Sequence, residues 1–240
     1  MQVPRSVMNK FENSMSVFTE SIGDCWTSCI ERVLRHGSPQ WDEDIAIQEI
    51  LGLSVHISSP KCHDDLVERI GDKAVIRRTL TKFSKGVDMP ERPFTYGSRI
   101  FDYSGVNQFE WIVERLKSKR ETKSATIGLL TPGSNDANLP CLTTIDVKIR
   151  ENRLELQFFF RSQNIFGRQY ANLLALSKLQ SDIATECMVE VGSMRGYIAS
   201  AHIYAFDVPE AQRIVSGEQT AISDEYYLKG PRSIRIGEHG

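Results

Sequence analysis

The spacing of apolar side chains predicts a chain that alternates between helices and strands. An apolar face recurs at helical spacing over 16–36, 106–119 and 170–188, which predicts amphipathic helices in these three places. Shorter helices are predicted over 65–70, 75–83 and 208–217. Each of these segments has an apolar side to bury, so we expect the helices to pack against a sheet.

Short apolar or alternating segments predict the strands of that sheet. Apolar and polar residues alternate within 48–60, 125–130 is a short apolar strand, and 196–207 is a closing strand. Between them, residues 143–162 alternate twice around an Arg-Glu-Asn turn, which predicts a β-hairpin. The order of elements predicts a mixed α/β (α+β) fold, with a largely antiparallel sheet flanked by helices in a single domain over 1–240.

The composition is that of an ordinary globular protein, with 240 residues of which 40% are hydrophobic and 25% charged. Its 29 Lys and Arg residues oppose 31 Asp and Glu residues. The absence of a basic excess argues against a nucleic-acid polymer as partner but leaves room for a site that binds one small anion. No apolar run reaches about 18 residues, and the stretch 1–18 lacks a signal-peptide core. We therefore expect a cytoplasmic protein with no membrane contact.

The cysteines do not form a disulfide framework, because their number is odd and no export signal precedes them. They are Cys25, Cys29, Cys62, Cys141 and Cys187. Cys25 and Cys29 lie one helical turn apart, and no histidine falls at a ligand spacing from them, so we interpret them as small core residues. No metal site is predicted.

Cys141 is a candidate nucleophile. It follows Pro140 at a predicted junction of loop and strand, where a thiol is held rigidly and can face a cleft. Taken alone, a buried structural cysteine is the simpler interpretation. Arg161, however, emerges from the aromatic run 158–160 into a loop, and an arginine there is costly unless it meets an anion. Ser162 is a natural second donor to a phosphate.

Three further side chains match the parts of a nucleotide. The amide of Asn172 can both donate and accept, as the N3–H and O4 edge of a uracil requires. His202 and Tyr204 stand two residues apart on one face of a predicted strand and can donate to a sugar hydroxyl. The alternative for His202 is a buried core histidine.

These motifs resemble the thymidylate synthases and the related pyrimidine hydroxymethylases. The resemblance lies in Pro-Cys-Leu at 140–142, Arg-Ser-x-Asn at 161–164, Asn172 and Ser-Ala-His-Ile-Tyr at 200–204. The intervals from Cys141 to Arg161, Asn172 and His202 are 20, 11 and 30 residues in succession, as in the family. The most similar branch comprises the compact archaeal-type synthases and the cytidylate hydroxymethylases.

The resemblance varies along the chain. It is weak over 15–60, and 94–210 would form the core with the active site, including Tyr96-Gly97 as the family's Tyr-Gly pair. The tail 211–240 diverges from the family. Within the family the sheets of two subunits stack back to back, so the resemblance implies a homodimer.

The resemblance also implies a reaction. The Cys141 thiolate would add to C6 of a pyrimidine nucleotide, dUMP or UMP, and C5 would then take a one-carbon unit from 5,10-methylenetetrahydrofolate. Hydride transfer would give a methyl group, as in a methyltransferase, whereas water would give a hydroxymethyl group. Arg161 would bind the phosphate and lower the pKa of the Cys141 thiol.

The remaining roles are also implied by the resemblance. Ser162 would add a phosphate hydrogen bond, His202 and Tyr204 would hold the ribose 3′-hydroxyl, and Tyr96 would join the water network for C5 deprotonation. Asn172 would favour uracil over cytosine. The expected catalytic residues are Cys141, Tyr96 and Asn172, and the expected substrate-binding residues are Arg161, Ser162, Asn164, His202, Tyr204 and Lys123.

The chain departs from the family pattern at several positions. A loop that supplies a phosphate arginine corresponds to 37–46, where the chain has acids at 42–44. Two more arginines reach across the family's dimer from a stretch that matches 121–130, where Lys123 is the only basic residue. Asn164 replaces an aspartate that contacts the folate, and Glu68 is the nearest candidate for the family's catalytic glutamate. Two hypotheses therefore stand: an enzyme, or a degenerate member that binds a nucleotide without turnover.

Overall fold

The computed structural model describes residues 15–89, 94–133, 139–218 and 221–222. The strands are β1 (Ser16–Thr19), β2 (Ser38–Asp42), β3 (Ile45–Ile57), β4 (Thr126–Gly128), β5 (Leu142–Arg150), β6 (Arg153–Phe160), β7 (Gln163–Asn164) and β8 (Glu190–Tyr204). The helices are α2 (Ile22–His36), α3 (Asp65–Ile70), α4 (Lys73–Phe83), α5 (Tyr96–Phe101), α6 (Gln108–Ser118), α7 (Ile165–Cys187) and α8 (Val208–Val215), with a 3₁₀ turn at Ala205–Asp207.

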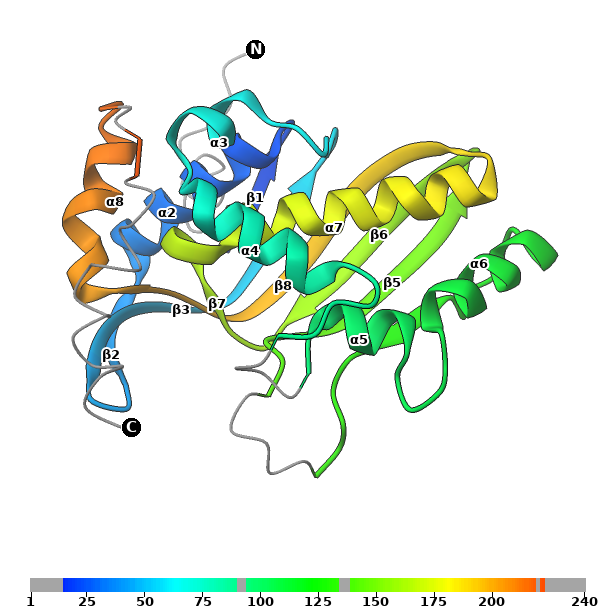
Figure 1. Ribbon diagram of the computed structural model, residues 1–240. Helices are drawn as coiled ribbons and strands as arrows, with labels where there is room; N and C mark the ends of the chain where they lie inside the picture. Colours follow the sequence, from blue (N-terminus) through cyan, green and yellow to red (C-terminus); the bar gives the residue numbers. More distant parts are fainter. Residues whose placement is uncertain (1–14, 90–93, 134–138, 219–220, 223–240) are drawn as a thin grey trace, which may run out of the picture.

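The strands described form one mixed sheet in the order β1-β3-β8-β6-β5-β4, with β2 added to β3 and β7 to β8. Helix α7 lies along one face of this sheet, α2 packs beside it, and α4 packs on α7 as an outer layer (Figure 1). The mixed class with flanking helices that the sequence predicted is confirmed. The pairs β1–β3, β6–β8 and β7–β8 are parallel, and the remaining pairs of the described sheet are antiparallel.

The helix predicted over 16–36 is wrong in its first turn and a half. Residues Ser16–Thr19 form β1, which pairs in parallel with β3, and the helix begins only at Ile22. Ser21 caps it, since its hydroxyl accepts from the Asp24 N–H at 3.1 Å. Phe18 and Ile22 happen to fall at a helical interval, so the apolar spacing alone could not separate strand from helix.

Helix α7 starts five residues before the predicted segment. The side chain of Asn164 caps it by accepting from the Gly167 N–H at 2.8 Å. The buried indole of Trp26 in α2 donates to the carbonyls of Ile165 and Phe166, both at 3.1 Å. These contacts fix the first turn of α7, and they place Asn172 in its third turn rather than at its beginning.

The hairpin predicted over 143–162 is present as β5 and β6. Glu151 and Asn152 connect the strands with φ angles of 50° and 60°, the left-handed pair that matches the twist of a two-residue hairpin. At the end of the hairpin opposite this turn, the loop before β5 lies next to the end of β6. The strands predicted over 48–60 and 196–207 are also present, as β3 and β8. β3 has the predicted length but begins and ends three residues earlier, and β8 begins six residues earlier and is longer than predicted.

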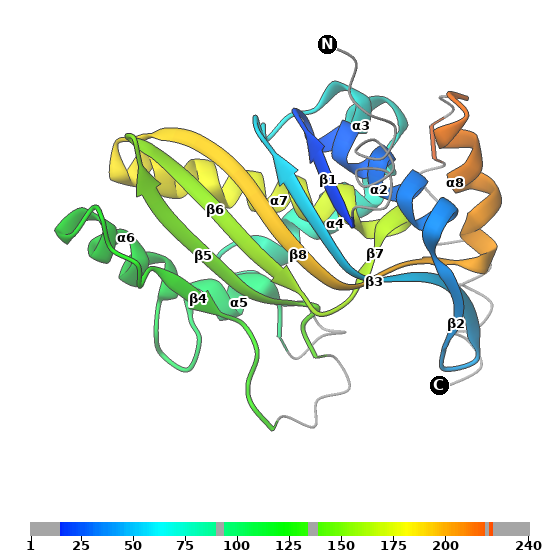
Figure 2. The same ribbon diagram turned by 180° about the vertical axis from the view of Figure 1, so that it is seen from behind.

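The second face of the sheet carries no helix among the described residues (Figure 2). Phe18 is 75% exposed there, and Phe159 and Tyr197 are 38% and 45% exposed. The rings of Phe159 and Tyr197 stack with centroids 5.6 Å apart. Within the described part of the chain, no helix combines the length and apolar character needed to cross a bilayer.

Candidate active site

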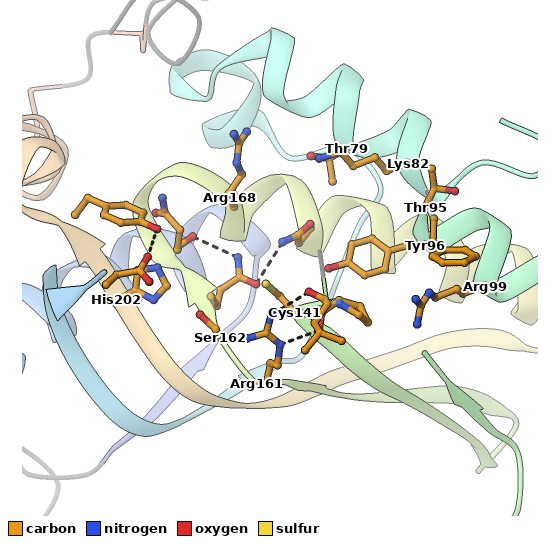
Figure 3. A pocket seen from close by; sticks show the side chains of 18 residues that line it. Thr79, Lys82, Thr95, Tyr96, Arg99, Cys141, Arg161, Ser162, Arg168 and His202 are labelled. Carbon is orange, nitrogen blue, oxygen red and sulfur yellow. Dashed lines mark hydrogen bonds between the residues drawn. The ribbon is translucent and has the colours of Figure 1, made fainter. Parts of the chain in front are cut away.

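A cavity of about 350 Å³ lies where the loop before β5, the end of β6, the first turns of α7 and the end of β8 converge (Figure 3). The N-terminus of α5, one side of α4 and the end of β2 complete its wall. Its volume lies within the range typical of small-molecule sites. Eight of the nine predicted site residues line it: Tyr96, Cys141, Arg161, Ser162, Asn164, Asn172, His202 and Tyr204.

Cys141 occupies the junction predicted for it, one residue before β5, with its side chain partly exposed to the cavity. The pairing of β5 with β6 extends one residue before β5 and one residue after β6, since the Arg161 N–H donates to the carbonyl of Cys141 at 2.8 Å. Two features therefore restrict the backbone at Cys141. Its carbonyl is hydrogen-bonded to Arg161, and the preceding residue is the rigid Pro140.

The guanidinium of Arg161 braces the loop before Cys141. Its Nε donates to the carbonyl of Pro140 at 3.0 Å, and its Nη2 donates to the carbonyl of Leu139 at 2.9 Å. A guanidinium carries five N–H donors in a fixed fork, so these two bonds leave donors for an anion in the cavity. Arg161 thus has a positioning role that the sequence did not indicate.

Tyr96 contacts the same junction from the opposite side. Thr95 caps α5 by accepting from the Ser98 N–H at 3.0 Å, which sets Tyr96 in the first turn. The Tyr96 hydroxyl accepts from the Leu142 N–H at 3.2 Å. A Cβ on Gly97 would collide with the backbone carbonyl of Ser84, which explains why glycine follows Tyr96.

One face of α7 supplies three cavity residues at intervals of four. Asn164, Arg168 and Asn172 all line the cavity, as helical spacing requires. The Asn172 amide donates to Oε1 of Gln163 at 3.3 Å. The Asn164 side chain is 8% exposed, and its Nδ2 finds no hydrogen-bond partner among the described residues. A buried donor without a partner is rare in folded proteins and calls for an explanation.

The last two predicted site residues, His202 and Tyr204, lie at the end of β8. The rings of His202 and Tyr204 lie on one face of the strand with centroids 5.3 Å apart, as their spacing of two residues predicted. The Tyr204 hydroxyl donates to Oδ2 of Asp42 at 2.7 Å. The acidic hairpin between β2 and β3 therefore touches the site directly.

A model of the thymidylate synthase family matches residues 30–229. The chain belongs to the thymidylate synthase family. A protein of Methanosarcina mazei named "Putative thymidylate synthase" is 32% identical over 218 residues, which cover 87% of this chain and 98% of the relative. One of the same name from Methanothermobacter thermautotrophicus is 30% identical over 217 residues, 83% of this chain and 98% of the relative. The resemblance found in the sequence is confirmed.

Two residues expected from the thymidylate synthase pattern do not reach the cavity. Lys123 is exposed just before β4 and does not line the cavity. Glu68 on α3 is exposed and lies 3.2 Å from His63, away from the site. Of the residues that the structure describes, no glutamate lines the cavity, and Asp42 supplies the carboxylate that does.

Sequence reasoning missed six polar residues of this cavity: Thr79, Lys82, Thr95, Arg99, Gln163 and Arg168. Arg99 is 3% exposed, donates to the carbonyl of Leu129 and stacks over the Phe94 ring at 4.8 Å. Arg168 could have been found, because it lies midway between Asn164 and Asn172 once α7 is started at its cap. Lys82 and Arg99 come from short helices distant in sequence, so no local pattern indicated them.

Proposed function

We propose that this protein transfers a one-carbon unit from 5,10-methylenetetrahydrofolate to C5 of a uridylate-type nucleotide, dUMP or UMP. The observation that supports this most is the convergence of Cys141, Arg161, Asn172 and His202 in one cavity. These residues come from four separate elements, and each has a chemical type that a different part of a pyrimidine nucleotide requires.

The reaction begins at the thiol. The Cys141 thiolate forms a bond to C6, and the electron pair of the C5–C6 double bond moves into the ring to give an enolate that is nucleophilic at C5. Asn172 holds the ring by accepting from N3–H and donating to O4. After C5 is alkylated, loss of its proton and departure of Cys141 restore the double bond.

Arg161 and Ser162 are proposed to bind the phosphate. Arg161 keeps N–H donors beyond the two that brace Leu139 and Pro140, so it can fix the loop and the anion together. Its positive charge near Cys141 favours the thiolate. His202 and Tyr204 would hold the sugar, and Tyr96 would order water for deprotonation of C5.

The cavity offers two features that fit a flat folate ring. Phe94 is 50% exposed at the cavity wall, with Arg99 stacked behind it, and Asn164 lines the cavity with an Nδ2 that has no partner among the described residues. When bound, methylenetetrahydrofolate would supply the carbon and, for a methyl product, the hydride. The Asn164 Oδ1 already accepts the hydrogen bond that caps α7. Asn164 would therefore offer the folate a donor, whereas the aspartate of the family offers an acceptor.

We further propose a homodimer in which the open faces of two sheets pack together. Phe18, Phe159 and Tyr197 expose their rings on this face, as an interface core requires. In such a dimer Lys123 would serve the cavity of the partner subunit, which agrees with its position outside its own cavity.

The absence of a cavity glutamate among the described residues favours a second candidate, a family member that binds a nucleotide without turnover. Release of tritium from C5 separates the two. The protein is incubated with C5-tritiated dUMP, UMP and dCMP, with and without methylenetetrahydrofolate. The proposed enzyme releases tritium from a uridine nucleotide, and the Cys141→Ser variant releases none. Folded protein that releases none from any nucleotide would support the second candidate, and the product mass assigns methyl or hydroxymethyl.

A further inference from the structure

The end of β2 places an acid against the sugar side of the cavity. Asp42 is the last residue of β2 and pairs with Ile45 across the turn, while Ile47 of β3 pairs with Tyr204 of β8. This register holds the hairpin over the end of β8. It accounts for the 2.7 Å hydrogen bond from the Tyr204 hydroxyl to Asp42 Oδ2.

This hydrogen bond determines what the pair can offer a ligand. A tyrosine hydroxyl has one hydrogen, and an ionised carboxylate only accepts. With its hydrogen directed at Asp42, the Tyr204 oxygen faces other groups as an acceptor, and the second oxygen of Asp42 is an acceptor too. Tyr204 is 5% exposed, so a ligand group that contacts this pair is favoured when it carries a hydrogen to donate.

The charge of Asp42 disfavours a phosphate in this part of the cavity. A carboxylate repels a dianion, and the cations that line the described cavity come from other elements (Figure 3): Arg161 follows β6, Arg168 lies on α7, Lys82 on α4 and Arg99 on α5. Neighbouring sugar hydroxyls are neutral and can each donate, and a carboxylate is the group that receives the 2′-hydroxyl of ribose in many dinucleotide sites.

We propose that Asp42 and Tyr204 form a site for the 2′-hydroxyl of ribose, so that the substrate is a ribonucleotide rather than a deoxyribonucleotide. This inference rests on the proposed function, because it needs a pyrimidine nucleotide in the cavity with its sugar beside His202 and Tyr204. Asp42 acts on the sugar and takes no part in the chemistry at C5.

Binding of UMP and dUMP, measured by calorimetry for the wild type and for Asp42→Ala, tests the inference. A hydrogen bond to a charged acceptor is worth at least about tenfold in affinity, so the wild type binds UMP at least about tenfold more tightly than dUMP. Asp42→Ala weakens UMP to the level of dUMP and leaves dUMP unchanged or tighter. Asp44→Ala is the matched control, since it removes the same charge from the same hairpin at a residue that does not line the cavity.

The outcomes separate this inference from the proposed function. Equal wild-type affinity for UMP and dUMP, a preference for dUMP, or an unchanged preference in Asp42→Ala would overturn the inference and leave the proposed function standing. Failure of the wild type to bind either nucleotide would overturn both. Asp42→Asn keeps one acceptor and the contact with Tyr204, so it should retain part of the preference if Asp42→Ala proves unstable in thermal unfolding.

Discussion

The backbone N–H of Arg161 donates to the carbonyl of Cys141 at 2.8 Å. The candidate nucleophile and the candidate phosphate-binding arginine therefore face each other across adjacent strands. The Arg161 side chain returns over the same junction to the carbonyls of Leu139 and Pro140. Any change at Arg161 is thus expected to displace the thiol as well as to remove a charge.

Replacement of Arg161 by lysine separates these two effects. Lysine keeps the charge but lacks the planar fork, so the loop before β5 loses its brace. We expect kcat/KM to fall by about tenfold to a hundredfold, and the free energy of unfolding to fall by about 1–2 kcal/mol for the two lost hydrogen bonds. Steady-state kinetics and urea unfolding measure both.

Arg153→Lys is the control for this change. Arg153 lies at the other end of the hairpin, 60% exposed, with Glu190 at 3.8 Å. It should leave kcat/KM unchanged and alter stability by less than about 0.5 kcal/mol. Wild-type activity in Arg161→Lys would show that the charge alone matters and that the brace does not.

Tyr96→Phe tests the contact between α5 and the start of β5. The variant leaves the Leu142 N–H without the acceptor it has at 3.2 Å and removes the hydroxyl from the cavity. We expect kcat to fall at least about tenfold with little change in KM, and stability to fall by about 1 kcal/mol. Tyr103→Phe, whose hydroxyl contacts Thr131, is the control and should retain kcat. A change in KM alone would contradict a role in the chemical step.

The base specificity is expected to depend on the pair Asn172 and Gln163. The Asn172 Nδ2 donates to Gln163 Oε1 at 3.3 Å, which sets the direction of its amide oxygen. Gln163→Leu should therefore reduce the ratio of uridine to cytidine nucleotide affinity by about threefold to tenfold. Asn172→Asp replaces the donor with an acceptor and should reverse the preference toward the cytosine amine. Calorimetry with UMP, dUMP, CMP and dCMP measures each ratio. An unchanged ratio in both variants would exclude recognition of the base by Asn172 and Gln163.

Thiol reactivity should distinguish Cys141 from the structural cysteines. A hydrogen bond with Cys29 and burial raise the pKa of Cys25 well above its usual value, and burial raises the pKa of Cys187. A raised pKa means less thiolate at a given pH, and the thiolate is the species that is alkylated. At about neutral pH, iodoacetamide should label Cys62 and Cys141, which are exposed or partly exposed, and spare the buried Cys25, Cys29 and Cys187.

A nucleotide should protect Cys141 from this reagent and leave Cys62 reactive, because Cys62 is exposed and lies outside the cavity. Peptide mass spectrometry reports each site separately. Equal labelling of Cys141 with and without saturating UMP or dUMP would count against nucleotide binding in this cavity.

The sequence predicted the elements of this fold better than their limits. The β5–β6 hairpin was visible because alternation and turn residues agree there, and His202 and Tyr204 followed directly from the period of a strand. The start of α7 was missed, because Gly167, Arg168 and Gln169 separate Ile165 and Phe166 from the apolar face that begins at 170, and only the cap at Asn164 marks the boundary. That error hid Arg168.

The rest of the site depended on contacts between distant segments. Asp42 meets Tyr204 only because β2 folds back on β3 and β3 pairs with β8, a register that no local pattern specifies. Lys82 and Arg99 likewise reach the cavity through the packing of α4 and α5. The acidic hairpin was recognised in the sequence as a departure from the family, but its contact with Tyr204 required the structure.

The open face of the sheet should bring two subunits together. Phe159 and Tyr197 stack on this face and remain 38% and 45% exposed, and interface cores are enriched in such aromatic residues. A charge at their centre would have to be buried without a partner, which costs several kcal/mol. Tyr197→Glu should therefore shift the protein from dimer to monomer in light scattering at micromolar concentration.

Trp111→Glu is the control for this change. Trp111 is exposed on α6, so this variant should remain dimeric. If Lys123 of the partner subunit serves the cavity, the Tyr197→Glu monomer also loses nucleotide affinity, whereas a wild type that is monomeric from the outset would exclude this assembly.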